Sequence, residues 1–226
     1  MTEKTEIIAI DGPSGSGKST TARAVAKKLG FVFLDTGAMY RALTLLALEN
    51  DIEPADEAKL SALAEKIDIK FADADDGQKV YVDDRDITDD IRTPVVTRAV
   101  SEVSAHPKVR EHLVAMQKEI GRKQNIVAEG RDTTSVVFPD AGLKVYLSAS
   151  IEERARRRLK DFERMGKSTT LADQIRDIKR RDDYDSGRRT SPLTKTSDSI
   201  EVDTTNMTID QQVDKIIELF RARNSA

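Results

Sequence analysis

The chain contains neither cysteine nor tryptophan, and aromatic residues make up only 4% of its 226 positions. Without cysteine it can form no disulfide, no thiolate metal site and no cysteine nucleophile. Long hydrophobic runs are missing as well: Ile7 to Ile10 is a run of four, and no later segment is long enough for a leader or a membrane span. From these absences we expect a cytoplasmic protein that contacts no membrane.

A large excess of charge of one sign is also missing, because 37 Lys and Arg nearly balance 40 Asp and Glu and leave a net charge of −3. This balance gives no electrostatic reason for binding nucleic acid, so we expect no specific nucleic acid as a partner. Charged residues make up 34% of the chain and hydrophobic residues 38%, which is typical of a soluble protein with charged helix faces. The length suits one large α/β domain with a small insertion.

The strongest motif is the segment Gly12 to Ser19, which matches the phosphate-binding pattern G-x-x-x-x-G-K-[ST]. A β-branched run predicts a strand over 6–10, and apolar residues at helical spacing predict a helix over 19–29. Glycines let successive backbone N–H groups face phosphate oxygens at a helix start that favours anions. Lys18 would reach the β- and γ-phosphates and the Ser19 hydroxyl would bind Mg²⁺, so the motif predicts a bound nucleoside triphosphate. The residues assigned to ATP are Gly12, Pro13, Ser14, Gly15, Ser16, Gly17, Lys18, Ser19 and Thr20.

Strand-like runs recur between helical patterns along the rest of the chain. The predicted strands are 31–34, 125–128, 143–147 and 199–202, and the predicted helices are 38–49, 94–120, 151–165, 171–185 and 208–222. This alternation predicts a parallel sheet covered on both faces, with the ligand beyond the carboxyl ends of the strands.

The stretch from about 66 to 92 breaks this rhythm. Apolar residues alternate over 67–71 and again over 80–82, and Asp76-Gly77 between them is typical of a hairpin turn. The acidic run 73–77 has a faint likeness to a calcium loop, but its glycine is one place early and the last acidic ligand is missing. We therefore predict a small β-rich insertion with a solvated turn.

Charged residues follow two of the predicted strands and indicate a second anion site. In the segment 35–41, Thr36 would cap the next helix, and Arg41 lies one turn further. The segment 129–132 follows the third strand in the same way. One such segment alone would more simply be a helix cap with solvated charges, but two at one edge of a parallel sheet favour a binding site.

A late charged strip is the third candidate. Arg181, Asp185 and Arg188 fall at i, i+4 and i+7, on one predicted helix face, where two guanidinium groups and one carboxylate could bind a phosphorylated sugar. The simpler alternative is the charged end of a helix. The basic run 154–158 is interpreted as a salt-bridged helix face.

These motifs together resemble the cytidylate kinase family of nucleoside monophosphate kinases over essentially the whole length. The resemblance rests on 10–20, on 34–41, on 130–132 with 136–141, and on 180–193. The family usually reads Gly-Arg-Asp-x-Gly-Thr, whereas here Thr134 stands at the second glycine position and Ser135 at the threonine. Glu129 also replaces a commoner aspartate. We expect the backbone just after Asp132 to differ accordingly.

The resemblance implies a three-layer P-loop kinase fold with a parallel five-stranded sheet and helices on both faces. The chain 1–226 would be a single kinase domain, with its core at about 1–65, 93–150 and 171–226. A β-rich monophosphate-binding insertion would occupy about 66–92 and a lid about 154–170. We expect a monomer.

The implied reaction is transfer of the γ-phosphoryl group of ATP to CMP or dCMP, with Mg²⁺ as cofactor. Catalysis would rest on Lys18, Arg131, Arg157, Arg158 and Arg188, with only one of the two neighbouring lid arginines contacting the transferred group. The implied CMP-binding residues are Thr36, Tyr40, Arg41, Ser101, Arg110, Arg131, Asp132, Arg181, Asp185 and Arg188. Ser19 would bind Mg²⁺, and Glu129 would hold the ion through water.

Two alternatives remain open on the residues alone. A P-loop kinase of another small metabolite would use the same phosphate loop. A nucleic-acid-binding P-loop ATPase would use the arginine clusters to track a phosphate backbone.

Overall fold

The computed structural model describes residues 5–74, 77–164 and 166–224. It divides into two compact units, of which the first comprises 1–33 with 124–226 and the second comprises 34–123. The first unit is built on a five-stranded sheet and the second contains a three-stranded one.

The sheet of the first unit has the strand order β2-β6-β1-β7-β8. Its strands are β1 (Ile7–Asp11), β2 (Val32–Asp35), β6 (Ile126–Gly130), β7 (Leu143–Ser148) and β8 (Ile200–Asp203). β1 pairs in parallel with β6 and β7, and β7 pairs in parallel with β8. Ile8, Ala9 and Ile10 of the central strand are fully buried, as a strand covered on both faces requires. The predicted parallel α/β sheet is confirmed.

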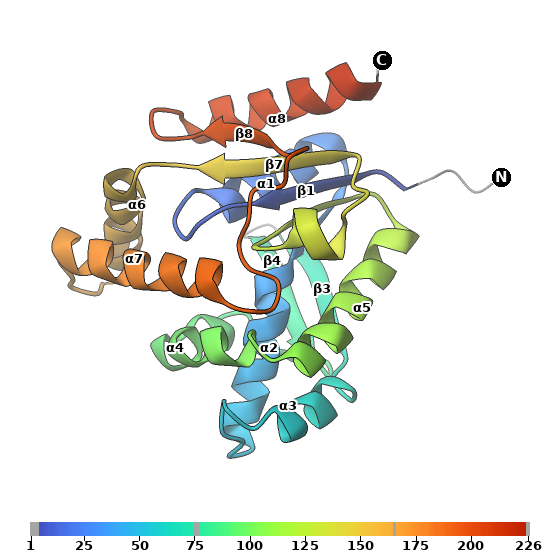
Figure 1. Cartoon of the computed structure of the whole chain (residues 1–226), viewed down its shortest axis with the longest axis vertical. Coiled ribbons are helices and arrows are strands. Elements are labelled where there is room, and N and C mark those ends of the chain that lie inside the picture. Colours follow the sequence, from blue (N-terminus) through green and yellow to red (C-terminus); the bar gives the residue numbers. More distant parts are fainter. Residues whose placement is uncertain (1–4, 75–76, 165, 225–226) are drawn as a thin grey trace. The chain divides into compact units, whose positions relative to one another are not determined.

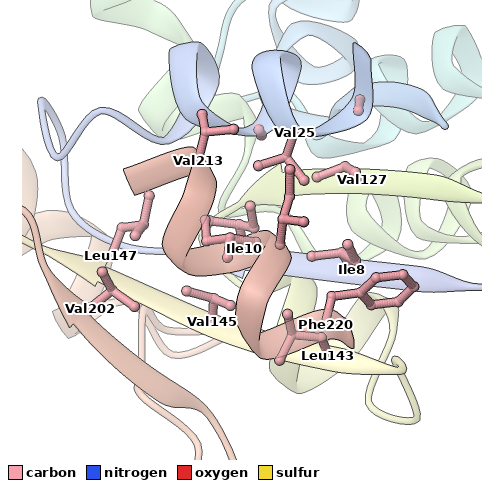
Figure 2. Packing of buried hydrophobic residues seen from close by; sticks show 14 of the residues in the cluster. Ile8, Ile10, Val25, Val127, Leu143, Val145, Leu147, Val202, Val213 and Phe220 are labelled. Carbon is pink, nitrogen blue, oxygen red and sulfur yellow. The ribbon is translucent and has the colours of Figure 1, made fainter. Parts of the chain in front are cut away.

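Helices of the first unit cover this sheet. They are α1 (Lys18–Leu29), α6 (Ile151–Arg164), α7 (Leu171–Gly187) and α8 (Ile209–Asn224). α1 packs against α8, and α6 packs against α7. Figure 2 shows the hydrophobic cluster beneath the first pair, which joins side chains of α1 and α8 to those of the strands: Val25, Val213, Phe220, Ile8, Ile10, Val127, Leu143, Val145, Leu147 and Val202. This core fixes the carboxyl ends of β1, β6 and β7, after which the phosphate-binding and arginine-bearing loops begin.

The second unit contains four α-helices among its described residues (Figure 1). They are α2 (Thr36–Glu49), α3 (Glu57–Ala64), α4 (Pro94–Val103) and α5 (Pro107–Lys123), and a 3₁₀ turn spans Asp90–Arg92. A small antiparallel sheet has the order β3-β4-β5, with β3 (Ile69–Ala74), β4 (Gly77–Val82) and β5 (Arg85–Asp86). These strands confirm the β-rich character predicted for 66–92. The turn residues Asp75 and Asp76 of the acidic run lie outside the described residues.

The single helix predicted over 94–120 is wrong. The structure has α4 and α5 there, separated by Ser104 to His106, because Pro107 lacks an amide hydrogen and begins a new helix. Sequence periodicity also missed α3, which is short and is capped by the Asp56 carboxylate accepting the Lys59 N–H at 3.1 Å. The remaining predicted elements agree with the structure to within a few residues at their ends.

The proposed limits of the insertion (66–92) and of the lid (154–170) stay predictions, and the two compact units follow different boundaries. Over the described parts of the chain, the structure has no helix with the length and hydrophobicity needed to cross a bilayer.

Candidate active site

The phosphate-binding loop connects β1 to α1 as the motif predicts. Gly12 has φ 154°, and a Cβ there would lie 2.1 Å from the carbonyl oxygen of Leu147, so the loop begins where only glycine fits. Gly17 has φ 95° and directly precedes α1, which places the first free amides of the helix beside the loop. The loop thus has the backbone shape of an anion-binding site.

Lys18 is buried at the start of α1, where it is 5% exposed. Its Nζ donates a hydrogen bond of 2.8 Å to the carbonyl oxygen of Pro13. Burial and, to a lesser extent, the positive charge of Arg131 lower the pKa of Lys18 to about 7, although Glu129 and Asp11 act in the opposite direction. An anionic ligand beside Lys18 would stabilise its charged form.

Ser19 and Glu129 meet at the end of β6. The Ser19 hydroxyl donates a hydrogen bond of 2.6 Å to Oε1 of Glu129, and Glu129 is buried. A hydroxyl and a carboxylate are both hard oxygen ligands, which suits Mg²⁺. Among the described residues no group of three or more His, Asp or Glu could enclose a metal ion. An ion here would take its other ligands from phosphate and water, as Mg²⁺ commonly does.

Arg131 and Asp185 form an ion pair between the end of β6 and α7. Arg131 Nε donates to Asp185 Oδ2 at 2.7 Å, and Arg181 Nε lies 3.9 Å from the same oxygen. Burial alone would raise the pKa of Asp185, but the charges of Arg131, Arg181 and Arg188 hold it below its ordinary value. The structure thus places Arg131, from the motif after β6, near Arg181, Asp185 and Arg188, which were predicted from the late charged strip.

Arg188 does not share a helix face with Arg181 and Asp185, so that part of the prediction is wrong. α7 ends at Gly187, and Arg188 follows it with extended backbone angles (φ −67°, ψ 143°). Its Nε donates to the carbonyl oxygen of Ser191 at 2.9 Å. The position of Arg188 relative to Asp185 comes from the turn after the helix and not from helical spacing.

Arg157 and Arg158, neighbours in the proposed lid, have different surroundings. Arg157 donates from Nη1 to the Ser16 carbonyl oxygen at 3.2 Å and from Nη2 to the Thr204 carbonyl oxygen at 2.6 Å. Its Nε bonds Glu153 in the previous helical turn at 3.1 Å. Arg158 is half-buried and has no such bond within the described part of the chain. Burial lowers the pKa of Arg158, although a guanidinium remains protonated in proteins.

A second ion pair, between Arg154 of α6 and Asp182 of α7, was not predicted. Asp182 Oδ1 accepts the Ser14 N–H at 3.2 Å, and Arg154 Nη1 donates to the Ser14 carbonyl oxygen at 3.1 Å. Both helices therefore contact the third residue of the phosphate loop. The basic run 154–158 was the only signal for Arg154, and it indicated a helix face with salt bridges along the helix, whereas Arg154 is 7% exposed and pairs with another helix.

Asp11, the last residue of β1, was also missed. Its carboxylate is fully buried and accepts hydrogen bonds from the amides and hydroxyls of both Thr133 and Thr134. Thr133–Val137 form a π-helical turn just after Asp132. The local change in backbone expected from Thr134 is thus an ordered turn. Thr134 has a negative φ in this turn, so the position does not require a glycine.

The second unit holds the other predicted nucleotide contacts. Asp35, and not Thr36, caps α2, because its Oδ1 accepts the Ala38 N–H at 2.9 Å. Thr36 is the first helical residue and is buried. The prediction of Thr36 as the cap is therefore wrong, since an aspartate one place earlier is an equally good capping residue.

Arg41 and Arg110 in this unit are both held by backbone carbonyls. Arg41 Nη1 donates to the Ile91 carbonyl oxygen at 3.2 Å and to Thr97 Oγ1 at 2.8 Å. Arg110 lies over the ring of Tyr40, 5.3 Å from its centroid, and its Nη1 donates to the Ser104 carbonyl oxygen at 3.1 Å. Ser101, whose carbonyl oxygen accepts the Ser104 hydroxyl at 3.0 Å, lies on α4.

Comparison with known proteins identifies the family. The family model for cytidylate kinase matches residues 8–222. The chain is 48% identical to the cytidylate kinase of Carboxydothermus hydrogenoformans over 217 residues, which cover 96% of this chain and 98% of that one. The cytidylate kinase of Caldanaerobacter subterraneus subsp. tengcongensis is 45% identical, with 98% and 97% covered, and that of Enterococcus faecalis is 47% identical, with 96% of each covered. The chain belongs to the cytidylate kinase family.

Solved structures agree on the fold. An uncharacterised protein from Eubacterium ventriosum has a TM-score of 0.55 at 14% identity, with 97% of this chain and 99% of that chain covered. A gluconokinase from Sinorhizobium meliloti has a TM-score of 0.50 at 14% identity, with 97% and 93% covered. Membership of the cytidylate kinase family makes the chain an ATP-dependent kinase, and it favours the predicted reaction over the kinase of another metabolite and the nucleic-acid-binding ATPase.

Proposed function

We propose that this member of the cytidylate kinase family transfers the γ-phosphoryl group of ATP to CMP and dCMP with the residues that its motifs predict. The observation that carries the assignment is the cluster of Lys18, Arg131 and Asp185. Lys18 comes from the ATP motif, and the other two come from motifs assigned to CMP. Arg131 bonds Asp185 at 2.7 Å, and its positive charge contributes to the lowered pKa of Lys18, which supports a single site for both nucleotides.

The reaction needs cations more than it needs a base. The phosphate of CMP has a second pKa near 6, so it is largely dianionic at neutral pH and can attack without losing a proton. What opposes the reaction is the repulsion between two anions that approach in line. Lys18, Arg131 and Arg188 would offset that repulsion, and Arg131 would exchange its bond with Asp185 for one with phosphate or hold both.

The histidines agree with a reaction that uses no histidine base. His106 Nε2 lies 2.7 Å from the Pro54 carbonyl oxygen just before α5, and His112 Nε2 lies 3.3 Å from Glu65. Both are therefore engaged within the second unit, as expected of structural residues.

Asp132 would read the base. A carboxylate accepts a hydrogen bond from the N4 amino group of cytosine, whereas uracil presents an acceptor at that position. Asp132 is buried, so an unpaired carboxylate there would cost about 1–3 kcal/mol or more. Ser101 and Arg110 would contact the same base, while Thr36, Tyr40 and Arg41 would bind the rest of the acceptor nucleotide. Arg181 and Asp185 would address the ribose.

Ser19 and Glu129 would hold Mg²⁺, with Glu129 acting through water. Their oxygens already lie 2.6 Å apart and match the ligand preference of this ion. When bound with ATP, the ion would supply positive charge that neutralises the negative charge developing on the phosphates.

The test measures ADP release with CMP, dCMP, UMP, AMP, a single-stranded oligonucleotide and no acceptor. We expect rapid release with CMP and dCMP, slow release with UMP, and little with the others, all abolished by EDTA. Release driven by the oligonucleotide or by another small acceptor would contradict the proposal. We also propose a cytoplasmic monomer, which sedimentation and cell fractionation test.

A further inference from the structure

Each carboxylate oxygen of Asp11 accepts two hydrogen bonds. Its Oδ1 accepts the Thr133 N–H at 2.9 Å and the Thr133 hydroxyl at 2.6 Å. Its Oδ2 accepts the Thr134 N–H at 2.8 Å and the Thr134 hydroxyl at 2.6 Å. All three residues are at most 1% exposed. One carboxylate thus takes four donors from two consecutive residues.

The four hydrogen bonds between Asp11 and the two threonines make this part of the structure rigid. A buried carboxylate is strongly unfavourable unless its oxygens are hydrogen-bonded, and bonds to a charged acceptor are about twice as strong as neutral ones. The planar carboxylate and the consecutive backbone amides also fix each other's orientation. Any rotation of the turn at Thr133 and Thr134 would break several of these bonds together.

The arrangement joins the two segments on which the reaction depends. Asp11 pairs with Gly130 in the sheet and directly precedes Gly12, where the phosphate loop begins. Thr133 directly follows Arg131 and Asp132. The Asp132 carbonyl oxygen accepts the N–H groups of Val136 and Val137 at 2.9 and 3.2 Å, so Asp132 itself is part of the turn that Asp11 holds.

The side chain of Thr134 adds a bond that the backbone alone would not supply. The amide would be present with any residue but proline at this position, whereas the hydroxyl comes from the threonine. This hydroxyl lies 2.6 Å from Oδ2 of Asp11, and Thr134 is 1% exposed. The Thr134 hydroxyl therefore contributes to the hold of Asp11 on the turn.

We propose that Asp11 and Thr134 are positioning residues of the phosphoryl-transfer site, which hold Arg131 and Asp132 in the orientation that binds CMP. The inference rests on the proposed function of Asp132 as the residue that reads cytosine. Neither Asp11 nor Thr134 contacts a substrate in this account. Their effect reaches CMP through the turn, and ATP binding depends on it much less.

The experiment compares Thr134→Val, Thr134→Ser and the control Thr196→Val in steady-state assays with CMP and UMP. Thr196 also makes a side-chain hydroxyl bond, to Ser199 at 2.5 Å, before β8. Thr134→Val should raise the KM for CMP at least about fivefold and lower the ratio of kcat/KM for CMP over UMP, because a charge-assisted bond is lost. The KM for ATP should stay within about twofold. Thr134→Ser should restore wild-type values, and Thr196→Val should not alter them.

A double-mutant cycle tests whether the effect passes through Asp132. In an Asp132→Asn background, Thr134→Val should lower the CMP-over-UMP ratio no further. If the Asp11→Asn variant folds, it should raise the KM for CMP and lower the CMP-over-UMP ratio more than Thr134→Val does. If it does not fold, the Thr134 variants alone test the inference.

Three results would overturn the inference, and the first is distinguishable from the other two. Wild-type protein that fails to phosphorylate CMP would overturn the proposed function and this inference with it. An active wild type for which Thr134→Val lowers only the melting temperature, with unchanged KM values and an unchanged base preference, would overturn the inference alone. A Thr134→Val effect that adds fully to that of Asp132→Asn would do the same.

Discussion

Arg157 donates hydrogen bonds to both oxygens of Thr204, at 3.1 Å to the hydroxyl and at 2.6 Å to the carbonyl. A third bond, to the carbonyl oxygen of Ser16, joins the same guanidinium to the phosphate loop. Arg158, one residue later, has no comparable bond in the described structure. Two adjacent arginines that are equivalent in sequence therefore differ in structure: Arg157 supports the loop, and we expect Arg158 to bind the transferred group.

Substitution should separate these tasks. Arg158→Ala should lower kcat at least about tenfold with little change in melting temperature, because a cation near the transferred group is lost. Arg157→Ala should lower the free energy of unfolding by about 2 kcal/mol, since several partly buried bonds are lost. Thermal unfolding and steady-state kinetics on both variants, with the exposed Arg156→Ala as control, check this. Equal losses of kcat without any loss of stability would contradict it.

Lys18→Met should lower turnover at least about a hundredfold, because a contact with the developing charge is worth roughly 3 kcal/mol. The fold should survive, since methionine fills similar space and removes a buried charge. Rate measurements at saturating ATP and CMP test the first part, and circular dichroism tests the second. Near-normal turnover would remove Lys18 from the catalytic residues.

The lowered pKa of Lys18 predicts how stability depends on pH. Its pKa is about 7 in the folded protein and 10.5 in the unfolded chain, so the unfolded state binds more protons between those values. Stability of the wild type should therefore rise with pH across this window relative to Lys18→Met, by about 1.4 kcal/mol per pH unit at most. Urea unfolding of both proteins at pH 7, 8 and 9 measures the difference. A difference that does not change with pH would mean that Lys18 keeps its ordinary pKa.

Asp132→Asn should reduce the preference for CMP over UMP about tenfold, because an amide can present either a donor or an acceptor to the base. The quantity to measure is the ratio of kcat/KM for the two acceptors. If CMP activity persists and that ratio is unchanged, another residue reads the base.

Local sequence rules predicted the fold well where the relevant residues are consecutive in the chain. The phosphate loop could be placed because strand, glycines and helix are consecutive, and the parallel sheet followed from the alternation of strands with helices. The rules failed at Pro107, where an apolar period continues through a proline that starts a second helix. They also failed at Arg188, whose position depends on the turn after Gly187 and not on the period of α7.

Within the candidate site, the sequence predicted only residues that stand in motifs. Lys18, Glu129, Arg131 and Asp185 stand in motifs, and the structure brings them together as expected. The residues that hold them are paired over long separations, with Asp11 bonded 122 and 123 positions away. Neither periodicity nor a local motif predicts such a contact, because the two segments come together only when the sheet forms.

The bond between the Ser14 amide and the Asp182 carboxylate means that the resting phosphate loop already binds an anion. That anion belongs to the protein itself, and Arg154 neutralises it. A phosphate group that accepted a hydrogen bond from the Ser14 N–H would therefore have to displace the Asp182 carboxylate as well as water. Displacement of Asp182 would remove one of the contacts between α7, which carries Asp182, and the loop.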